Sequence, residues 1–341
     1  MLKDLTVVLE RYPAAVRPLD QPEDLGNAGG LSGARFWRYR SGTGTLLVRA
    51  WPTDGPPLVT LERIHGWLAE LTTLGFVPVP IAGLDGRTIV VYAGQFWEVG
   101  PWMPGVSDPG RPPTAGRVRA ACSALAAFHA RLRRHATVGP SCGILARLRE
   151  VEALSIRGFA ALGRSVAESP NDRIGSIARR WLEVAPPFAA SLRAGLSRAA
   201  SRPVARQPCL RDARPEHFLF EGDRVSGLVD FGAMGEDSVA ADLARLGSDW
   251  LGHDRLLRAE ALRAYSAVRP LDHTELDLIA VFEETGALLI GAHWMRWHFL
   301  ERRRFNDPGA VVSGLERGLD RLLARLCPGG RALDVSDDEP R

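Results

Sequence analysis

Two aspartates in the C-terminal half of the chain have the types and spacing of a pair that could transfer a phosphoryl group. Asp212 lies five residues before His217, and Asp230 follows in the run Val229-Asp230-Phe231-Gly232. Kinase-type transfer uses one carboxylate to accept the proton of the acceptor hydroxyl. A second carboxylate, with a partner five residues after the first, holds a metal ion. The spacing predicts Asp212 as the catalytic carboxylate and Asp230 as a metal ligand.

His217 occupies the place of the second metal ligand in this spacing. The carboxylate of Asp230 is the hard oxygen ligand that Mg²⁺ prefers, whereas an imidazole nitrogen suits softer metals. Two interpretations of His217 stay open. It ligates the metal, with Mn²⁺ as the alternative to Mg²⁺, or it has a structural role such as a hydrogen bond to Asp212.

Composition bounds the class of protein. The 341 residues are 45% hydrophobic, which is ample for a buried core and suggests roughly two domains or lobes. The net charge of +3 is mild, and no basic run is interleaved with aromatic residues, so we expect no nucleic-acid partner. Lys3 is the only lysine, so 42 of the 43 basic residues are arginine.

The cysteines and the apolar segments indicate a cytoplasmic protein without a membrane partner. None of the four cysteines forms a C-x-x-C pair, which argues against a zinc site and a disulfide framework and favours reduced thiols. The N-terminal residues contain no apolar signal region. The most apolar window, 276–295, includes three acidic residues and is not a typical membrane span. The cysteines are Cys122, Cys142, Cys209 and Cys327.

The elements before residue 100 read as strands with one helix. A glycine-rich segment, 27–34, precedes two strand-like runs at 36–40 and 45–51. Apolar residues recur at helical spacing over 60–73. Two further strand-like runs follow, at 88–92 and 95–100.

The rest of the chain is predicted to be mainly helical. We expect a β-rich nucleotide-binding lobe over 1–100, a hinge over 101–105, a helical lobe with the catalytic and acceptor-binding residues over 106–333, and a disordered tail over 334–341. The helix-like segments are 117–133, 144–162, 174–196 and 275–304, together with a segment that starts at Val239.

A β-rich lobe, a hinge and a helical lobe with D-x-x-x-x-H and D-F-G resemble the aminoglycoside phosphotransferase and choline kinase-like small-molecule kinases. Asp242-Leu243-Ala244 matches their D-L-A run. Trp97-Glu98-Val99 and 102–105 are especially similar to type II homoserine kinase-like members. The resemblance implies an α+β, bilobal protein kinase-like fold. It also implies transfer of the γ-phosphate of ATP, with Mg²⁺, to a hydroxyl of a small molecule such as an amino alcohol or amino sugar.

The resemblance also implies a nucleotide site with one departure. Related kinases place a lysine on the strand after the glycine-rich loop, and Arg49 takes that position here. Arginine can bind phosphate bidentately, although it is not equivalent to lysine. We expect Glu62 on the following helix to pair with Arg49, with Glu70 as the less favoured candidate. The backbone from Glu98 to Gly100 is expected to hold adenine.

The glycine-rich loop is expected to approach the nucleotide phosphates, because glycine removes the Cβ obstruction to backbone N–H groups. Its candidate residues are Gly29, Gly30, Ser32 and Gly33. Two departures lie near Asp212: His217 stands where the family has asparagine, and Leu210 stands where it has the histidine of H-G-D. The nonstandard Arg49 and His217 keep a second hypothesis open, a nucleotide-binding pseudokinase that acts as a regulatory or partner-binding module.

For three further residues the favoured interpretation is a structural role in the core. His129 lies on the apolar side of its helix, so we expect a satisfied core histidine and not a catalytic base. Trp294 and Trp297 are three apart on one helical face and are expected in the core, with the lining of an acceptor pocket as the alternative. The sequence does not name the acceptor, because kinases of this fold act on many alcohols.

Overall fold

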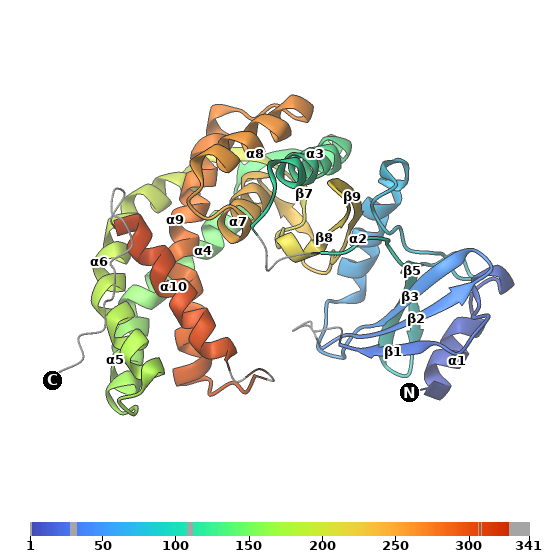
Figure 1. Cartoon of the computed structure of the whole chain (residues 1–341), viewed down its shortest axis with the longest axis horizontal. Coiled ribbons are helices and arrows are strands. Elements are labelled where there is room, and N and C mark those ends of the chain that lie inside the picture. The colour runs from blue at the N-terminus through green and yellow to red at the C-terminus, as the bar shows by residue number, and fades with distance from the viewer. Residues whose placement is uncertain (1, 28–32, 108–111, 306, 308, 327–341) are drawn as a thin grey trace. The chain divides into compact units, whose positions relative to one another are not determined.

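The computed structural model describes residues 2–27, 33–107, 112–305, 307 and 309–326 (Figure 1). The predicted nucleotide-binding residues Gly29, Gly30 and Ser32, and the predicted tail, lie outside this part of the chain. The chain divides into two compact units. The first unit combines Met1–Thr137 with Arg206–Asp272, and the second combines Val138–Ala205 with His273–Arg341.

A five-stranded antiparallel sheet with the order β1-β2-β3-β5-β4 forms the N-terminal part of the first unit (Figure 1). Alternating side chains divide this sheet into two faces. One face buries Trp37 and Trp97, which stack with ring centroids 5.5 Å apart. The strands are β1 (Glu23–Gly26), β2 (Arg35–Ser41), β3 (Gly44–Ala50), β4 (Val90–Tyr92) and β5 (Gln95–Pro101).

Helix α1 (Leu2–Glu10) covers the buried face of the sheet. Leu5, Val8 and Leu9, with Tyr12 just beyond the helix, recur at helical spacing and pack with Trp37 and its neighbours. The predicted pattern for residues 1–100, strands with one helix at 60–73, does not include this helix. The opposite face of the sheet carries Arg49 of β3 directly across from Glu98 of β5, and helix α2 (Leu58–Ala69) follows β3.

The remainder of the first unit holds the two predicted catalytic aspartates. Asp212 follows strand β7, and Asp230 follows strand β9. Phe231, next to Asp230, stacks with Phe128 of helix α3 at 6.1 Å, so the core positions this turn. The elements are α3 (Ala115–Leu132), β7 (Pro203–Cys209), the 3₁₀ turn η5 (Pro215–His217), β8 (Phe218–Glu221), β9 (Arg224–Leu228), β10 (Gly235–Asp237), α7 (Ala240–Trp250) and α8 (Arg255–Val268).

The second unit is a helical assembly. The predicted helix over 144–162 is divided by a turn of π-helix, η4 (Leu154–Gly158), into α4 and α5. Helices α9 and α10 approach closely where Gly318 faces Gly291: a Cβ on Gly318 would lie 2.6 Å from the Gly291 Cα. The helices are α4 (Cys142–Ala153), α5 (Phe159–Ala167), α6 (Arg173–Ser201), α9 (His273–Met295), the π turn η6 (Arg296–Leu300) and α10 (Ala310–Leu326).

The segment His273–Leu300 is the one described helix that is long and apolar enough to cross a membrane. Of its most apolar window, 61% is buried inside the protein, as in a core helix. Trp294 packs edge to face on Trp297, 5.2 Å between centroids, and lies against Gly314 of α10. This packing agrees with the core interpretation of Trp294.

The sheet followed by helices agrees with the predicted α+β architecture. The compact units divide the chain within β6 (Thr137–Pro140), within β7 and at the start of α9, not at 101–105. The lobe boundaries expected from the sequence therefore stay a prediction. The remaining short elements are β6 (Thr137–Pro140), η1 (Ala14–Val16), η2 (Thr72–Leu74) and η3 (Arg133–His135).

The stacked tryptophans should dominate the stability of the N-terminal sheet. Trp97 is 1% exposed, so we expect Trp97→Ala to lower the free energy of unfolding by about 3–5 kcal/mol through the cavity it leaves. Val91→Ala on β4, where the side chain is 47% exposed, should change it by less than about 0.5 kcal/mol. Urea unfolding followed by circular dichroism compares the two variants. Equal losses would contradict the assignment of this core.

Candidate active site

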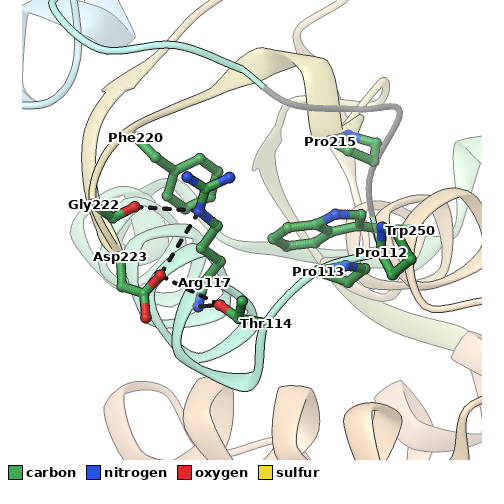
Figure 2. A pocket seen from close by; sticks show the side chains of 9 residues that line it. All are labelled: Pro112, Pro113, Thr114, Arg117, Pro215, Phe220, Gly222, Asp223 and Trp250. Atoms are coloured by element: carbon green, nitrogen blue, oxygen red, sulfur yellow. Dashed lines mark hydrogen bonds and ion pairs between the residues drawn. The ribbon is translucent and has the colours of Figure 1, made fainter.

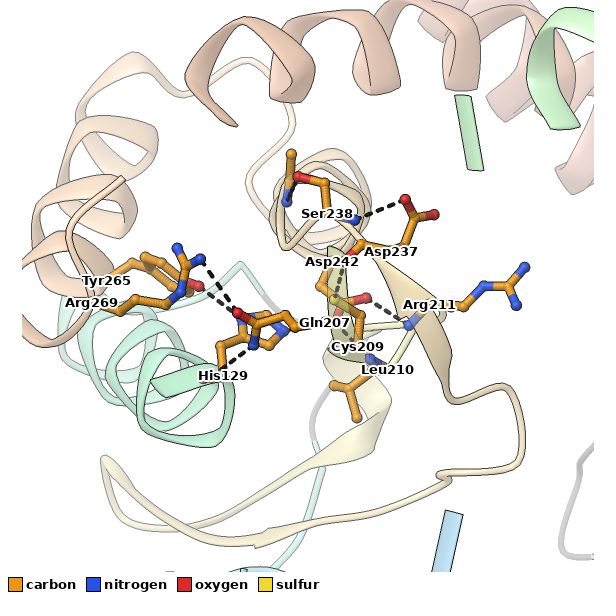
Figure 3. Close-up of polar contacts among 11 residues, drawn as sticks. His129, Gln207, Cys209, Leu210, Arg211, Asp237, Ser238, Asp242, Tyr265 and Arg269 are labelled. Carbon is orange, nitrogen blue, oxygen red and sulfur yellow. Dashed lines mark hydrogen bonds and ion pairs between the residues drawn. The ribbon is translucent and has the colours of Figure 1, made fainter. Parts of the chain in front are cut away.

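The loop that carries Asp212 is held by a buried carboxylate from helix α7. Asp242 has no exposed surface and accepts hydrogen bonds from the backbone N–H groups of Leu210 and Arg211, both at 2.7 Å (Figure 3). A buried carboxylate requires such donors, because it has left water. Asp242, recognised in the sequence only through the D-L-A run, thus fixes the backbone immediately before Asp212.

His129 completes the coordination of Asp242. Its Nε2 lies 3.0 Å from Asp242 Oδ2, and its Nδ1 lies 2.8 Å from the hydroxyl of Tyr265 (Figure 3). A carboxylate oxygen accepts hydrogen bonds, so Nε2 of His129 carries the hydrogen of this bond. His129 is fully buried with both nitrogens bonded. The prediction of a satisfied core histidine is confirmed.

Cys209 lies beside this pair without the chemistry of a metal ligand. Ligand atoms of His129, Cys209 and Asp242 lie within 4.8 Å of one another. Burial, reinforced by the charges of Asp242 and Asp237, raises the pKa of the Cys209 thiol well above its ordinary value. Metals bind the thiolate, whereas the Cys209 thiol donates to the Asp237 carbonyl at 3.3 Å. The cluster is therefore structural.

Two residues at the site adopt the left-handed backbone conformation that favours glycine. Arg211 has φ +64° and Asp230 has φ +63°. Each such non-glycine residue costs on the order of 1 kcal/mol or more and needs support from its surroundings. For Arg211, the bond to Asp242 supplies that support. The sequence does not predict this strained backbone, because arginine and aspartate are common in ordinary turns.

Two arginines hold the side chain of Asp212. Arg214 Nε and Arg245 Nε lie 3.0 and 3.2 Å from the same oxygen, Oδ1. Each arginine also contacts a second carboxylate: Arg214 NH1 donates to Glu216 at 3.1 Å, and Arg245 NH1 lies 3.4 Å from Asp249. The alternating charges fix Asp212 with 35% of its side chain exposed. Both arginines contact Oδ1, and neither of these contacts involves Oδ2.

His217 connects the two predicted catalytic aspartates. Its Nδ1 lies 2.9 Å from the backbone carbonyl of Asp212, and its Nε2 lies 3.6 Å from Asp230 Oδ2. Because a carbonyl only accepts, Nδ1 carries the hydrogen of the first bond, and Nε2 is the ring nitrogen that lies near Asp230. A bond to Asp212 was one of the two predicted roles, and the structure contains it. The donors of Asp230 and Nε2 also fit a divalent cation.

Arg49 lies on the same side as Asp230 without a hydrogen bond of its own. Its guanidinium lies 3.5 Å from Glu98 Oε1 and 3.7 Å from Asp230 Oδ1, both longer than a hydrogen bond. Its side chain is only 15% exposed and stacks over Trp51 at 4.6 Å. The buried Nε of Arg49 donates a hydrogen bond to no acceptor among the described residues. A buried donor that lacks an acceptor is costly, so Nε of Arg49 is an exception to the usual pairing of buried polar groups.

The prediction that Glu62, or the less favoured Glu70, pairs with Arg49 is wrong. Glu62 is exposed on α2, whose inward residues are Leu61, Ile64, His65 and Leu68. Glu70 pairs with Arg134 at 2.6 Å and with His135 at 2.9 Å. Arg49 and Glu98 lie opposite each other in the antiparallel register, so the cross-strand pair forms instead. Helical spacing alone could not show which face of α2 meets the strand.

Glu98 has a side-chain role in addition to the backbone role expected of it. It accepts from Trp51 Nε1 and His65 Nε2, both at 2.9 Å. Burial raises the pKa of Glu98, but the His65 hydrogen bond and the charge of Arg49 outweigh burial, so the pKa lies below its ordinary value of 4.5. Gly100, two residues on along the same face, would meet no atom within 4 Å if it had a Cβ, which leaves space above it.

The loop before β2 is described only from Gly33 onward. Gly33 has φ +73°, a conformation that suits glycine. A Cβ there would lie 3.6 Å from Pro52. The phosphate-binding role of Gly33 stays a prediction.

A separate hollow of about 280 Å³ lies beside the β8–β9 turn (Figure 2). Arg117 crosses it, with its guanidinium 5.1 Å from the centre of the Phe220 ring and Nε 3.2 Å from the Gly222 carbonyl. Pro215 and Trp250 also line it, whereas Asp212, Asp230 and Arg49 do not. The hollow is distinct from the cluster of catalytic candidates.

Comparison with known proteins decides the family. The model of the phosphotransferase enzyme family matches residues 25–278, more than half of the chain. This protein belongs to the phosphotransferase enzyme family. The match spans Arg49, Glu98, Asp212, His217 and Asp230.

Curated relatives of this phosphotransferase include homoserine kinases. The enzyme of Methylobacterium sp. (strain 4-46) is 29% identical over 232 residues, 65% of this chain and 65% of that protein. The enzyme of Parvibaculum lavamentivorans is 33% identical over 140 residues, 36% of this chain and 40% of that protein. The alignments span less than two thirds of the length of these relatives.

Solved structures establish the fold of this phosphotransferase. An aminoglycoside phosphotransferase from Alicyclobacillus acidocaldarius has a TM-score of 0.63 at 16% identity, covering 95% of this chain and 94% of its own. A microcompartment-associated aminopropanol kinase has a TM-score of 0.57 at 14% identity, covering 95% and 98%. The bilobal protein kinase-like fold predicted from the sequence is confirmed.

Removal of the loop anchor should destabilise this phosphotransferase. We expect Asp242→Ala to lower the free energy of unfolding by about 3–5 kcal/mol, because two buried backbone donors and Nε2 of His129 lose the carboxylate that accepts their hydrogen bonds. Asp254→Ala, which removes the N-cap of α8 at the surface, should cost about 1 kcal/mol. Chemical denaturation measures both. A loss for Asp242→Ala no greater than that of Asp254→Ala would contradict the anchoring role.

Glu98 should contribute stability that depends on pH. Its folded pKa is below the unfolded value, so its contribution is fully present above the unfolded pKa and is lost as pH falls through the folded pKa. The difference in unfolding free energy between the natural protein and Glu98→Gln should be constant above about pH 5.5 and shrink below about pH 4.5. Denaturation curves across this range measure it. A difference that grew as pH fell would contradict the sign.

Proposed function

We propose that this phosphotransferase is an ATP-dependent kinase that transfers the γ-phosphate to a hydroxyl of a small molecule. The observation that carries the proposal is the buried guanidinium of Arg49, which lies between Glu98 and Asp230 without hydrogen-bonding either. Phosphate oxygens satisfy such a planar set of donors bidentately. The family membership of the chain supports the same reaction.

In this mechanism the residues act at three positions. Arg49 and the glycine-rich loop hold the nucleotide phosphates, with adenine against the backbone from Glu98 to Gly100. Asp230 and His217 Nε2 would hold Mg²⁺ or Mn²⁺, which neutralises charge on the phosphates when it is bound. Asp212 Oδ2 accepts the hydrogen bond of the acceptor hydroxyl and receives its proton as the hydroxyl oxygen bonds to the γ-phosphorus. The bond between the γ-phosphorus and the bridging oxygen of the β-phosphate breaks in the same transfer, and ADP leaves with that oxygen.

The acceptor in this proposal is an amino alcohol or amino sugar. Homoserine is supported by the curated relatives, and an amino alcohol is supported by the aminopropanol kinase of the same fold. The proposed compartment is the cytoplasm, where ATP and Mg²⁺ are supplied and where the free thiols of Cys122, Cys142 and Cys209 stay reduced.

Binding of the nucleotide is the first test. Isothermal titration with a nonhydrolysable ATP analogue should give metal-dependent binding, and Asp230→Asn should weaken it at least tenfold because the metal loses its carboxylate. A preference for Mn²⁺ over Mg²⁺ would support His217 as a ligand. Metal-independent binding that survives Asp230→Asn would favour the pseudokinase. If the analogue does not bind under any of these conditions, the nucleotide assignment is contradicted.

Transfer itself tests Asp212. Asp212→Asn should lower kcat by about 10²–10⁴-fold with homoserine, aminopropanol, choline or amino sugars as acceptors, while the analogue still binds. Asp20→Asn is the matched control, since Asp20 also pairs with an arginine and is likewise 35% exposed. Radiolabelled phosphoryl transfer provides the measurement. Intact transfer in Asp212→Asn would refute the proposed proton acceptor.

A further inference from the structure

We propose that His65 is a positioning residue for nucleotide binding, which acts by fixing Glu98 and, through Glu98, Arg49. The inference rests on the proposed function and assigns a role to a residue that the sequence did not single out. Helix α2 supplies an imidazole at this point, whereas its Glu62 lies exposed on the outer side.

The ring of His65 is held from both sides. It is 6% exposed, with Nδ1 2.7 Å from Thr88 Oγ1 and Nε2 2.9 Å from Glu98 Oε2. The pKa of Glu98 lies below its ordinary value, which favours the ionised carboxylate. An ionised carboxylate only accepts hydrogen bonds, so Nε2 of His65 carries the hydrogen. Thr88 Oγ1 fixes the ring plane, because a hydroxyl can donate to or accept from Nδ1. His65 thus presents one directed donor to Glu98.

The two oxygens of Glu98 have separate partners. Oε2 accepts from His65 Nε2 and from Trp51 Nε1, both at 2.9 Å. Oε1 faces Arg49 NH1 at 3.5 Å. Two hydrogen bonds on Oε2 remove the rotational freedom of the carboxylate, and this determines where Oε1 lies. The position of Oε1 then determines where the charge of Arg49 is most stable.

Arg49 has little else to hold it in place. Its long side chain would lose substantial rotamer entropy on binding a phosphate if it were free beforehand. The Arg49 guanidinium lies over the rings of Phe36 and Trp51, with Cζ 4.9 and 4.6 Å from the ring centroids. These contacts do not stop the guanidinium from moving parallel to the ring planes. The charges of Glu98 at 3.5 Å and Asp230 at 3.7 Å set the remaining coordinate, and the shorter contact is the one to Glu98. Loss of the His65 bond should therefore weaken nucleotide binding even though His65 touches no nucleotide.

The experiment compares variants in nucleotide-analogue affinity, measured by titration with metal present. His65→Leu keeps the volume and removes the donor, so we expect affinity to fall about tenfold. His65→Gln retains an N–H group of similar reach and should restore affinity to within about threefold. His135→Leu removes a comparable histidine–glutamate pair elsewhere in the first unit, to Glu70 at 2.9 Å, and should leave affinity unchanged.

A double-mutant cycle separates positioning from general damage. In an Arg49→Ala background, His65→Leu should cause no further loss, because the residue that it positions is gone. Should His65→Leu fail to fold, Glu98→Gln replaces it in the same cycle with the same expectation. A full tenfold loss in the Arg49→Ala background, or unchanged affinity in His65→Leu, would overturn the inference.

The outcomes distinguish this inference from the proposed function. If the natural protein binds the analogue and His65→Leu binds it equally well, only the role of His65 falls. If the natural protein fails to bind the analogue, the proposed function falls and the positioning role falls with it.

Discussion

The loop that carries Asp212 depends on one buried carboxylate. Asp242 accepts the backbone N–H groups of Leu210 and Arg211 and receives a third bond from His129. These bonds hold Arg211 in the left-handed conformation, with φ +64°, and so direct the next residue, Asp212, toward Arg214 and Arg245. The anchor offsets the cost of placing a non-glycine residue in a backbone conformation that favours glycine.

The charges around Arg49 place its guanidinium between two carboxylates. Arg49 lies within 3.7 Å of two carboxylates but donates no hydrogen bond among the described residues. The attraction offsets part of the cost of burying the guanidinium, and the geometry leaves its donors for a ligand. The aromatic faces of Phe36 and Trp51 replace water around it. A guanidinium suits this environment because it is more weakly hydrated than an ammonium.

The departures from the family pattern are consistent with one another. Arginine at position 49 pairs with Glu98 on the adjacent strand, and Glu98 is held in turn by a histidine from α2. His217, in place of asparagine, uses Nδ1 to bind the Asp212 carbonyl and keeps Nε2 directed at Asp230. Each substitution has a partner in space, although the partners are distant in the chain.

The sequence by itself determined the features that local spacing controls. Alternating and helical periodicities located β2, β3, β5, α2 and α3, and the spacing of Asp212, His217 and Asp230 identified the residues that the fold brings together. Tertiary structure decided the rest: Glu98 as the partner of Arg49, the anchoring bonds of Asp242, the burial of α1 and the π turn that divides 144–162. These features depend on side chains that meet across 31 to 49 residues or more, or on a local packing adjustment. Periodicity shows which face of an element is apolar, but it does not show which polar side chain lies opposite.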